Sequence, residues 1–263
     1  MTELTRHTDD MPISQALVAT DKLEGDASWA ELKIGVMALQ GAFAEHIKMF
    51  ERLGVGSVVE LKTAVDFDGL DGIAIPGGES TAMVLIARPD GSTGGKEVAE
   101  VAEKAGTLRK LTEWVTERQM PTWGTCAGLI LLSNSLALGT TKQGGQGVIG
   151  GLDVVTSRNF FGRQLASFEA QLETPALGGA EPYNGVFIRA PAILEVGEGV
   201  EKLCTLEYHR PGQLAPEMVT VGVRQGHLLG CAFHPELTND PRWHKYFLGM
   251  VAEAKTAAAS GNF

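Results

Sequence analysis

The chain between residues 33 and 61 alternates short apolar runs with a longer stretch of helical periodicity. Residues 33–39 are mostly apolar and are followed by Gln40 and Gly41. Apolar side chains then recur every three to four residues, at positions 43, 47, 50 and 53, before Gly54. This pattern predicts a strand, a tight turn and a helix that ends at Gly54, and residues 57–61 predict a second strand.

The same alternation continues to residue 138. Residues 72–75 predict a third strand, buried on both faces, which stops at Pro76-Gly77-Gly78. Three further elements are expected, a helix over 97–119, a strand over 121–123 and a helix over 129–138. Alternating strands and helices with short connections predict an α/β fold, in which helices cover both faces of a mainly parallel sheet.

The second half of the chain is richer in strands. Further strands are expected at 152–157, 168–172, 183–188, 192–196, 202–208, 218–224 and 228–233, before a closing helix over 243–255. Glycine-rich stretches at 88–95 and 143–151 predict surface loops. We expect a flexible N-terminal extension over 1–32, one domain over 33–257 and a C-terminal tail over 258–263.

Charge and cysteine content narrow the functional classes. The chain carries 22 Lys and Arg against 32 Asp and Glu, a net charge of −10. Because an acidic surface repels phosphate groups, nucleic acid and membrane surfaces are disfavoured as partners. The three cysteines include no CxxC pair, which argues against a disulfide scaffold or structural zinc and favours a reducing, cytoplasmic setting. No secretory apolar segment is evident near the N-terminus, and we expect no metal and no cofactor.

A cysteine framed by glycines, in Gly124-Thr-Cys126-Ala-Gly128, is the strongest local signal for chemistry. It stands between a predicted strand and a predicted helix, as the nucleophile does in the G-x-S-x-G turn. The N-terminus of the following helix would favour a thiolate and a developing oxyanion. A buried structural cysteine is the alternative for an isolated Cys, but the glycine frame favours a nucleophile.

The motif His234-Pro-Glu236 supplies a candidate base. Because strand side chains alternate, we expect His234 and Glu236 to point to the same side of a strand. The carboxylate would then hold the imidazole in one tautomer and stabilise its protonated form. A strand-end histidine beside a solvated glutamate is the alternative. We expect the other cysteines and histidines to be core or surface residues without metal spacing: Cys204, Cys231, His7, His46, His209, His227 and His244.

The adjacent glycines Gly77 and Gly78 follow a predicted buried strand. Their backbone N–H groups could point at a ligand oxygen, which makes this turn a candidate oxyanion hole. A phosphate-binding loop is the rival interpretation, but the Walker lysine is missing. The third interpretation is an ordinary strand-to-helix turn without a binding role.

Six motifs together resemble one enzyme family. They are Leu39-Gln-Gly41, Pro76-Gly-Gly-Glu-Ser-Thr81, Gly124-Thr-Cys-Ala-Gly128, Arg158-Asn-Phe-Phe-Gly-Arg-Gln164, Gly185-Val-Phe-Ile-Arg-Ala-Pro191 and Phe233-His-Pro-Glu236. The set is similar to the glutaminase subunit of pyridoxal 5′-phosphate synthase, a branch of the class I glutamine amidotransferases, and spans about residues 33–255. The resemblance implies a flavodoxin-like, three-layer fold.

The resemblance also implies a reaction and its residues. L-Glutamine would be hydrolysed to glutamate and ammonia, and the ammonia would pass to a synthase subunit in a hetero-oligomeric ring complex. Cys126 is implied as nucleophile, His234 as general base and Glu236 as its orienting partner. An oxyanion site is implied at Gly78 and Ala127. Substrate contacts are implied for Gly77, Gly78, Glu79, Ser80, Arg158, Ile188 and Arg189. Four features depart from the family pattern: the 1–32 extension, the 88–95 insertion, an expanded 207–217 segment and Phe160.

Two other functions are compatible with some of these motifs. A class I glutaminase of another pathway, such as histidine or purine biosynthesis, would share the Cys and His-x-Glu motifs. A non-catalytic binding or chaperone-like protein on the same sheet would carry Cys126 as a redox sensor. Such a protein would not need His234 and Glu236 side by side.

Overall fold

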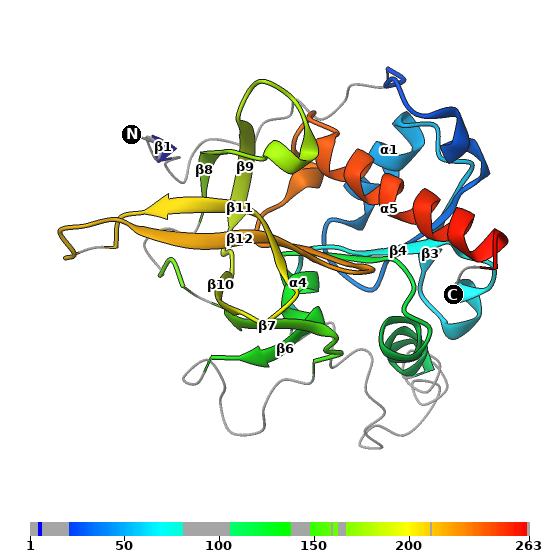
Figure 1. The fold of residues 1–263 in the computed structure, drawn as a ribbon, viewed down its shortest axis with the longest axis horizontal. Helices are drawn as coiled ribbons and strands as arrows, with labels where there is room; N and C mark the ends of the chain where they lie inside the picture. Colours follow the sequence, from blue (N-terminus) through cyan, green and yellow to red (C-terminus); the bar gives the residue numbers. More distant parts are fainter. Residues whose placement is uncertain are drawn as a thin grey trace.

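The computed structural model of this protein describes residues 5–6, 21–80, 106–137, 148–158, 160–162, 167–210 and 212–261. Within these residues, ten strands form one large sheet that has helices on both sides (Figure 1). The loop expected over 88–95, the first part of the helix expected over 97–119 and most of the loop expected over 143–151 lie outside the described residues.

One half of the large sheet is parallel. Its strands lie side by side in the order β3 (Ser57–Leu61), β2 (Lys33–Met37), β4 (Gly72–Ile75), β5 (Thr122–Thr125) and β13 (Leu228–Cys231). Every residue of β4, β5 and β13 is buried, as expected for parallel strands that are covered on both faces. The predicted α/β fold with a mainly parallel sheet is confirmed.

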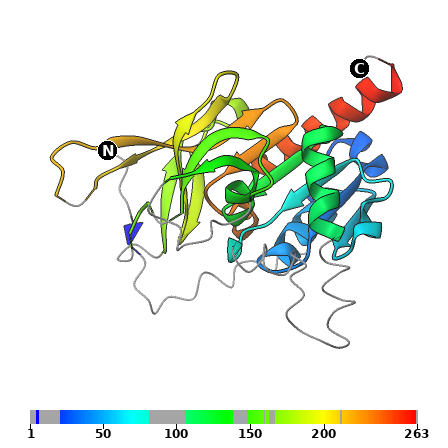
Figure 2. The same ribbon diagram turned by 90° about the horizontal axis from the view of Figure 1, so that it is seen from below.

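Beyond β13 most neighbouring strands are antiparallel. The order continues through β12 (Glu217–Gln225), β10 (Ala192–Val196), β7 (Leu152–Ser157) and β6 (Ser133–Leu136), and β11 (Glu201–Tyr208) pairs with β12. A small antiparallel sheet contains β1 (Thr5–Arg6), β8 (Ser167–Leu172) and β9 (Tyr183–Ile188). This strand-rich part, mainly green to orange, lies at one end of the molecule in Figure 2. The predicted strands of the second half are confirmed with small shifts of their ends.

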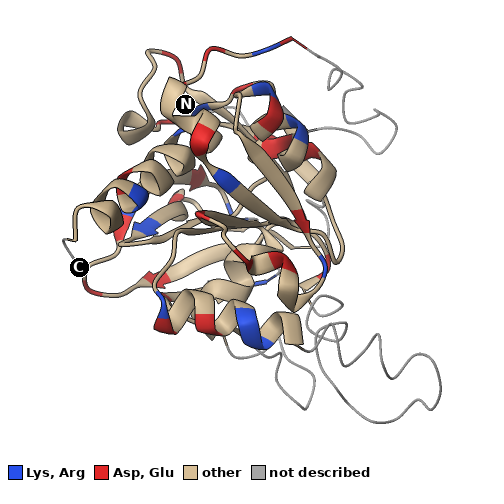
Figure 3. Ribbon diagram, turned by 90° about the vertical axis from the view of Figure 1, so that its right-hand side faces the viewer, with Lys and Arg blue, Asp and Glu red and all other residues tan. Residues whose placement is uncertain are grey.

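The covering helices come from distant parts of the chain. Helices α1 (Phe43–Arg52) and α5 (Arg242–Ala259) lie on one side of the sheet, and residues 106–112, with the π-helical turn η3 (Glu113–Glu117), lie on the other (Figure 1). Charged residues lie mainly on these helices and in loops, whereas the central strands carry few (Figure 3). Helix α1 ends, as predicted, just before Gly54, which has a φ of +79°.

Two predictions about element ends are wrong. The helix expected over 129–138 ends at Leu132 as α4 (Ala127–Leu132), and the next four residues form β6, which pairs with β7. The hydroxyl of Ser133 donates to carbonyls of the preceding turn, at 2.8 and 3.1 Å, and its backbone is extended. Serine and asparagine side chains form hydrogen bonds with the nearby backbone and therefore favour the end of a helix. Pairing with β7 then stabilises a strand here more than the apolar run stabilises a longer helix. Strand β13 likewise ends at Cys231, before His234.

Packing against the domain begins before residue 33. Residues Ala27–Glu31 form the short helix η1, and the side chain of Trp29 is part of the core with 8% exposure. The N–H of Leu23 donates to Arg52 O at 2.8 Å. At the other end, α5 extends to Ala259, two residues into the segment expected as a tail. Among the described residues no helix combines the length and apolar character needed to cross a membrane.

Candidate active site

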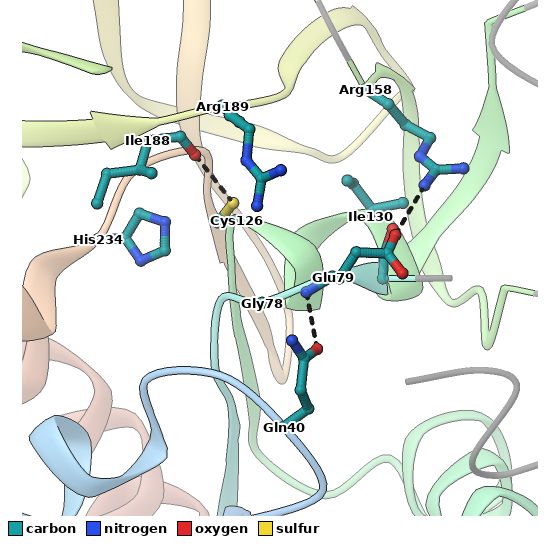
Figure 4. Close-up of a pocket in the computed structure, with 10 residues that line it drawn as sticks. Gln40, Gly78, Glu79, Cys126, Ile130, Arg158, Ile188, Arg189 and His234 are labelled. Carbon is teal, nitrogen blue, oxygen red and sulfur yellow. Dashed lines mark hydrogen bonds and ion pairs between the residues drawn. The ribbon is translucent and has the colours of Figure 1, made fainter. Parts of the chain in front are cut away.

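A cavity opens where three parallel strands end. The residues after β4, β5 and β13 meet there, at the carboxyl edge of the sheet, which is where open α/β sheets bind ligands. The lining residues are Gln40, Gly78, Glu79, Ser80, Cys126, Ile130, Arg158, Ile188, Arg189 and His234 (Figure 4). Most of the residues that the sequence proposed for the site therefore share one cavity.

Cys126 stands at the turn between β5 and α4. Its backbone has φ +48° and ψ −99°, a region that residues with a side chain rarely adopt. The conformation is held by the Cys126 N–H, which donates to Cys231 O at 2.8 Å, and by Ile130 N–H, which donates to Cys126 O at 3.2 Å. Strained non-glycine backbone of this kind is concentrated at functional sites. The thiol lies in the cavity, 3.9 Å from Ile188 O.

The two glycines that frame Cys126 allow the turn to pack closely. A methyl group on Gly124 would lie 2.4 Å from the backbone carbon of Gly128. One on Gly128 would lie 2.1 Å from Ile75 O on strand β4. The start of α4 therefore sits directly against two strands, a separation that no larger residue permits. The spacing of the motif follows from this packing.

His234 and Glu236 form a buried pair beside the thiol. Nδ1 of His234 and Oε1 of Glu236 are 2.7 Å apart, and the two residues are only 6% and 0% exposed. The expected contact is present, but the strand alternation used to predict it is wrong. His234 lies after β13 and caps the single turn η5 (Pro235–Leu237), and this turn brings Glu236 back onto the imidazole. The N–H of His234 also donates to Val186 O at 2.8 Å on β9.

The charges of this pair stabilise each other. Burial lowers the pKa of His234, but the charge of Glu236, together with the charge and hydrogen bond of Cys126, outweighs burial and raises this pKa well above its usual 6.5. Burial raises the pKa of Glu236, but the nearby His46 and His234 bring it below its usual value. The arrangement therefore favours an imidazolium at His234, stabilised by the Glu236 carboxylate.

The glycine turn after β4 lies against the same imidazole. A methyl group on Gly77 would lie 2.2 Å from Cε1 of His234 and 3.2 Å from Cβ of Cys126. The turn is fixed from the other side, because the Glu79 N–H donates to Oε1 of Gln40 at 2.8 Å. Ala42 N–H donates to Gly77 O at 3.2 Å.

Three further residues that the resemblance implied line the same cavity as the thiol. Arg158 Nη2 lies 3.6 Å from Glu79 Oε1, so the cavity carries both a guanidinium and a carboxylate (Figure 4). Arg189 has a φ of +44° directly after β9, which is a second strained backbone at this site. Gly77, Ala127 and Glu236 are not among the lining residues; Glu236 lies behind the imidazole of His234.

Sequence reasoning assigned no role to three residues that line this site or lie behind it. Gln40 lies in the Leu39-Gln-Gly41 motif, and its amide holds the glycine turn. His46 and His244 were expected to be ordinary core or surface residues, yet His46 Nε2 lies 3.3 Å from Glu236 Oε2 and His46 Nδ1 lies 3.0 Å from His244 Nε2. The apolar face of α1 that contains His46 was the available signal. Among the described residues no group of His, Cys, Asp or Glu is arranged to hold a metal ion.

The sequence profile of the SNO glutamine amidotransferase family matches residues 36–253. The chain belongs to this family. It is 43% identical over 249 residues to a probable pyridoxal 5′-phosphate synthase subunit PDX2 of Arabidopsis thaliana, an alignment that covers 88% of this chain and 90% of that protein. It is also 41% identical over 220 residues to pyridoxal 5′-phosphate synthase subunit PdxT of Corynebacterium jeikeium, with 84% and 97% covered.

A solved structure agrees with this assignment, and a second shares the fold. A crystal structure of a glutamine amidotransferase has a TM-score of 0.64 and 38% identity, and covers 83% of this chain and 98% of that one. A protein from Thermoplasma acidophilum that is named as a GMP synthase subunit has a TM-score of 0.52 at 17% identity, with 87% and 98% covered, and shares the fold alone.

Proposed function

We propose that this member of the family hydrolyses L-glutamine to L-glutamate and ammonia, with Cys126 as nucleophile, His234 as general base and Glu236 as its orienting partner. One observation carries the proposal. The strained Cys126 turn holds its thiol in a cavity beside an imidazole that is hydrogen-bonded at 2.7 Å to a fully buried carboxylate.

The first half of the reaction forms a thioester. The sulfur of Cys126 attacks the side-chain amide carbon of glutamine, and the carbonyl oxygen becomes an oxyanion beside backbone N–H groups of Gly78 and Ala127. The C–N bond then breaks, and the imidazolium of His234 gives its proton to the departing nitrogen, which leaves as ammonia. The product on the enzyme is a γ-glutamyl thioester of Cys126.

The second half releases glutamate. His234, now neutral, takes a proton from a water molecule whose oxygen attacks the thioester carbon. The C–S bond breaks, glutamate leaves and Cys126 returns as a thiolate beside the imidazolium of His234. Glu236 keeps its charge throughout and fixes the tautomer in which Nδ1 of His234 carries a proton.

The charged cavity residues suit the amino-acid end of glutamine. The guanidinium of Arg158 matches the α-carboxylate in charge and in its two-pronged geometry, and Arg189 adds a second positive charge nearby. The carboxylate of Glu79 complements the α-ammonium group. Ser80 and Ile188, which also line the cavity, complete the substrate contacts, whereas Gly77 lies behind the lining and leaves room for His234.

The ammonia would be used by a second protein. We propose that this partner is a pyridoxal 5′-phosphate synthase subunit, within a cytoplasmic, hetero-oligomeric ring complex, so that ammonia is incorporated into the vitamin B6 cofactor. Support comes from the curated relatives, which are named as subunits of pyridoxal 5′-phosphate synthase. The free thiols of all three cysteines agree with a reducing compartment.

Ammonia release from glutamine tests the proposal, with purified protein alone and with a candidate synthase subunit. Cys126→Ala should abolish release while the circular dichroism spectrum stays unchanged. Cys204→Ala removes a buried thiol outside the cavity and should retain activity. Ammonia release by a clean Cys126→Ala preparation would overturn the assignment. Release that no pyridoxal 5′-phosphate synthase subunit uses would favour a glutaminase of another pathway.

A further inference from the structure

Two buried histidines continue the line of polar groups behind Glu236. His46 comes from α1 and His244 from α5, 198 residues apart in the sequence. His46 Nε2 lies 3.3 Å from Glu236 Oε2, and its Nδ1 lies 3.0 Å from His244 Nε2. All three side chains have 0% exposure. The order of groups is therefore Cys126, His234, Glu236, His46 and His244.

The proton positions in this chain follow from burial and from the neighbouring atoms. Burial lowers the pKa of His46, and lowers that of His244 further with the help of His46, so both imidazoles are neutral and each carries one N–H. A carboxylate only accepts, so Nε2 of His46 carries the proton and Nδ1 accepts from Nε2 of His244. The remaining His244 Nδ1, which has no partner among the described residues, is then an acceptor.

Oε2 of Glu236, the carboxylate oxygen that faces His46, has this histidine as its neighbouring N–H group. Oε1 of Glu236 accepts from His234, whereas the buried Oε2 makes no hydrogen bond of full geometry within the described residues. The His46 Nε2–H dipole at 3.3 Å is therefore a polar contact that helps to compensate its burial. Nε2 of His46 is also 3.4 Å from Thr125 Oγ1, on the strand that leads to Cys126.

Packing alone does not account for histidines at these positions. Both rings lie in an aromatic cluster with Trp123, at centroid distances of 5.2 Å for His46 and 4.9 Å for His244. Phe50 and Phe247, which lie in the same cluster, show that larger apolar rings are accommodated there. An apolar ring at position 46 would keep the packing but remove the imidazole N–H that faces Oε2 of Glu236.

We propose that His46, held in one tautomer by His244, is a positioning residue of this site: it keeps the Glu236 carboxylate charged and turned so that Oε1 receives the Nδ1–H of His234. The inference rests on the proposed glutaminase function. It adds to the three motif residues a fourth and a fifth side chain, neither of which lines the cavity.

The test compares His46→Leu with His46→Gln in the full chain. Leucine removes the donor, whereas the glutamine amide can donate to the same oxygen. We expect His46→Leu to lower kcat for ammonia release by about 10- to 100-fold, because a misplacement of about 1 Å costs up to about 10²-fold. KM should stay within about twofold, since His46 is outside the cavity, and His46→Gln should recover most of the loss.

The pH profile separates positioning from packing. Without the His46 N–H, the Glu236 carboxylate ionises less readily, so the acid limb of kcat/KM should move to higher pH in His46→Leu and return in His46→Gln. A packing defect would lower the whole profile without moving its limb. The titratable and charged groups that act on Glu236 or on His46 are His234, Tyr183, Cys231, Glu45 and His244.

The outcomes are distinguishable. If the unaltered protein releases no ammonia, the proposed function fails. If it is active and His46→Leu matches it in kcat and pH profile, the positioning role fails. If His46→Leu does not fold, His46→Gln and His244→Phe give the comparison: near-normal kcat in the first with a several-fold loss in the second supports the role. Equal activity in both contradicts it.

Discussion

A methyl group on Gly77 would lie 2.2 Å from Cε1 of His234, closer than any side-chain carbon can approach the ring without moving it. The first glycine of the turn after β4 is therefore needed for space, in addition to any backbone freedom. The same methyl group would lie 3.2 Å from Cβ of Cys126, so the turn, the thiol and the imidazole fit together only when residue 77 has no side chain.

Gly77→Ala should therefore lower kcat for ammonia release by about 10²-fold, because His234 or the turn must shift by a sizeable fraction of an ångström. Gly249→Ala is the matched control. Gly249 lies in α5 with nothing within 4 Å of the added methyl group, so activity should stay and the free energy of unfolding should rise by about 0.5–1 kcal/mol. Steady-state kinetics and urea unfolding measure both. Full activity in Gly77→Ala would show that the turn adapts.

The three cysteines should differ sharply in reactivity. Cys126 lines the cavity, whereas Cys204 and Cys231 do not. Burial raises the pKa of both Cys204 and Cys231, so their thiols stay protonated and unreactive. Treatment of the native protein with iodoacetamide at pH 7 should modify Cys126 alone and stop ammonia release, as peptide mass spectrometry and an activity assay can show. Denaturant should expose all three thiols. Rapid labelling of Cys204 or Cys231 in the native protein would contradict this arrangement.

Arg158→Ala should act on binding more than on chemistry. If Arg158 holds the α-carboxylate of glutamine, its removal should raise KM by about 10- to 100-fold, the effect of losing a charge-assisted hydrogen bond of about 1.5–3 kcal/mol. The fall in kcat should be smaller. Arg224→Ala is the control, because Arg224 contacts Tyr246 and Glu253 on α5, away from the cavity. An unchanged KM would remove Arg158 from the binding site.

Stability should fall on the acid side because of the buried histidines. The pKa values of His46 and His244 are lowered from 6.5 by burial. Below pH 6.5 the unfolded chain therefore binds more protons than the folded one, and the free energy of unfolding decreases as pH falls. Each such histidine contributes a slope of at most about 1.4 kcal/mol per pH unit.

Urea unfolding between pH 7 and 5 measures this slope, and His244→Phe should reduce it. His234 has the opposite sign, since its raised pKa gives a stabilisation that is present below pH 6.5 and lost as pH rises through the folded value. Because His234 is present in both proteins, the difference between them reports on His244. Equal slopes would mean that His244 titrates in the folded state.

Local patterns were sufficient wherever one property dominates a segment. The apolar run 72–75 predicts β4 because a strand covered on both faces excludes water from every side chain, and all four residues are buried. The helix predicted to continue past Ser133 was wrong, because a mixed apolar and polar segment can form either a helix or a strand. The choice there depends on β7, which is distant in the sequence. The pairing of His234 with Glu236 was expected on a strand, yet a single helical turn provides it.

By itself, the sequence determined the α/β order of elements and the glycine-framed turn at Cys126, because strand burial and tight turns depend on neighbouring residues. Only the tertiary structure decided that Gly77 must leave room for His234 and that His46 and His244 stand behind Glu236. Those contacts join α1, α5 and the two segments that follow β4 and β13. No sequence spacing encodes a distance between segments that meet only in the folded sheet.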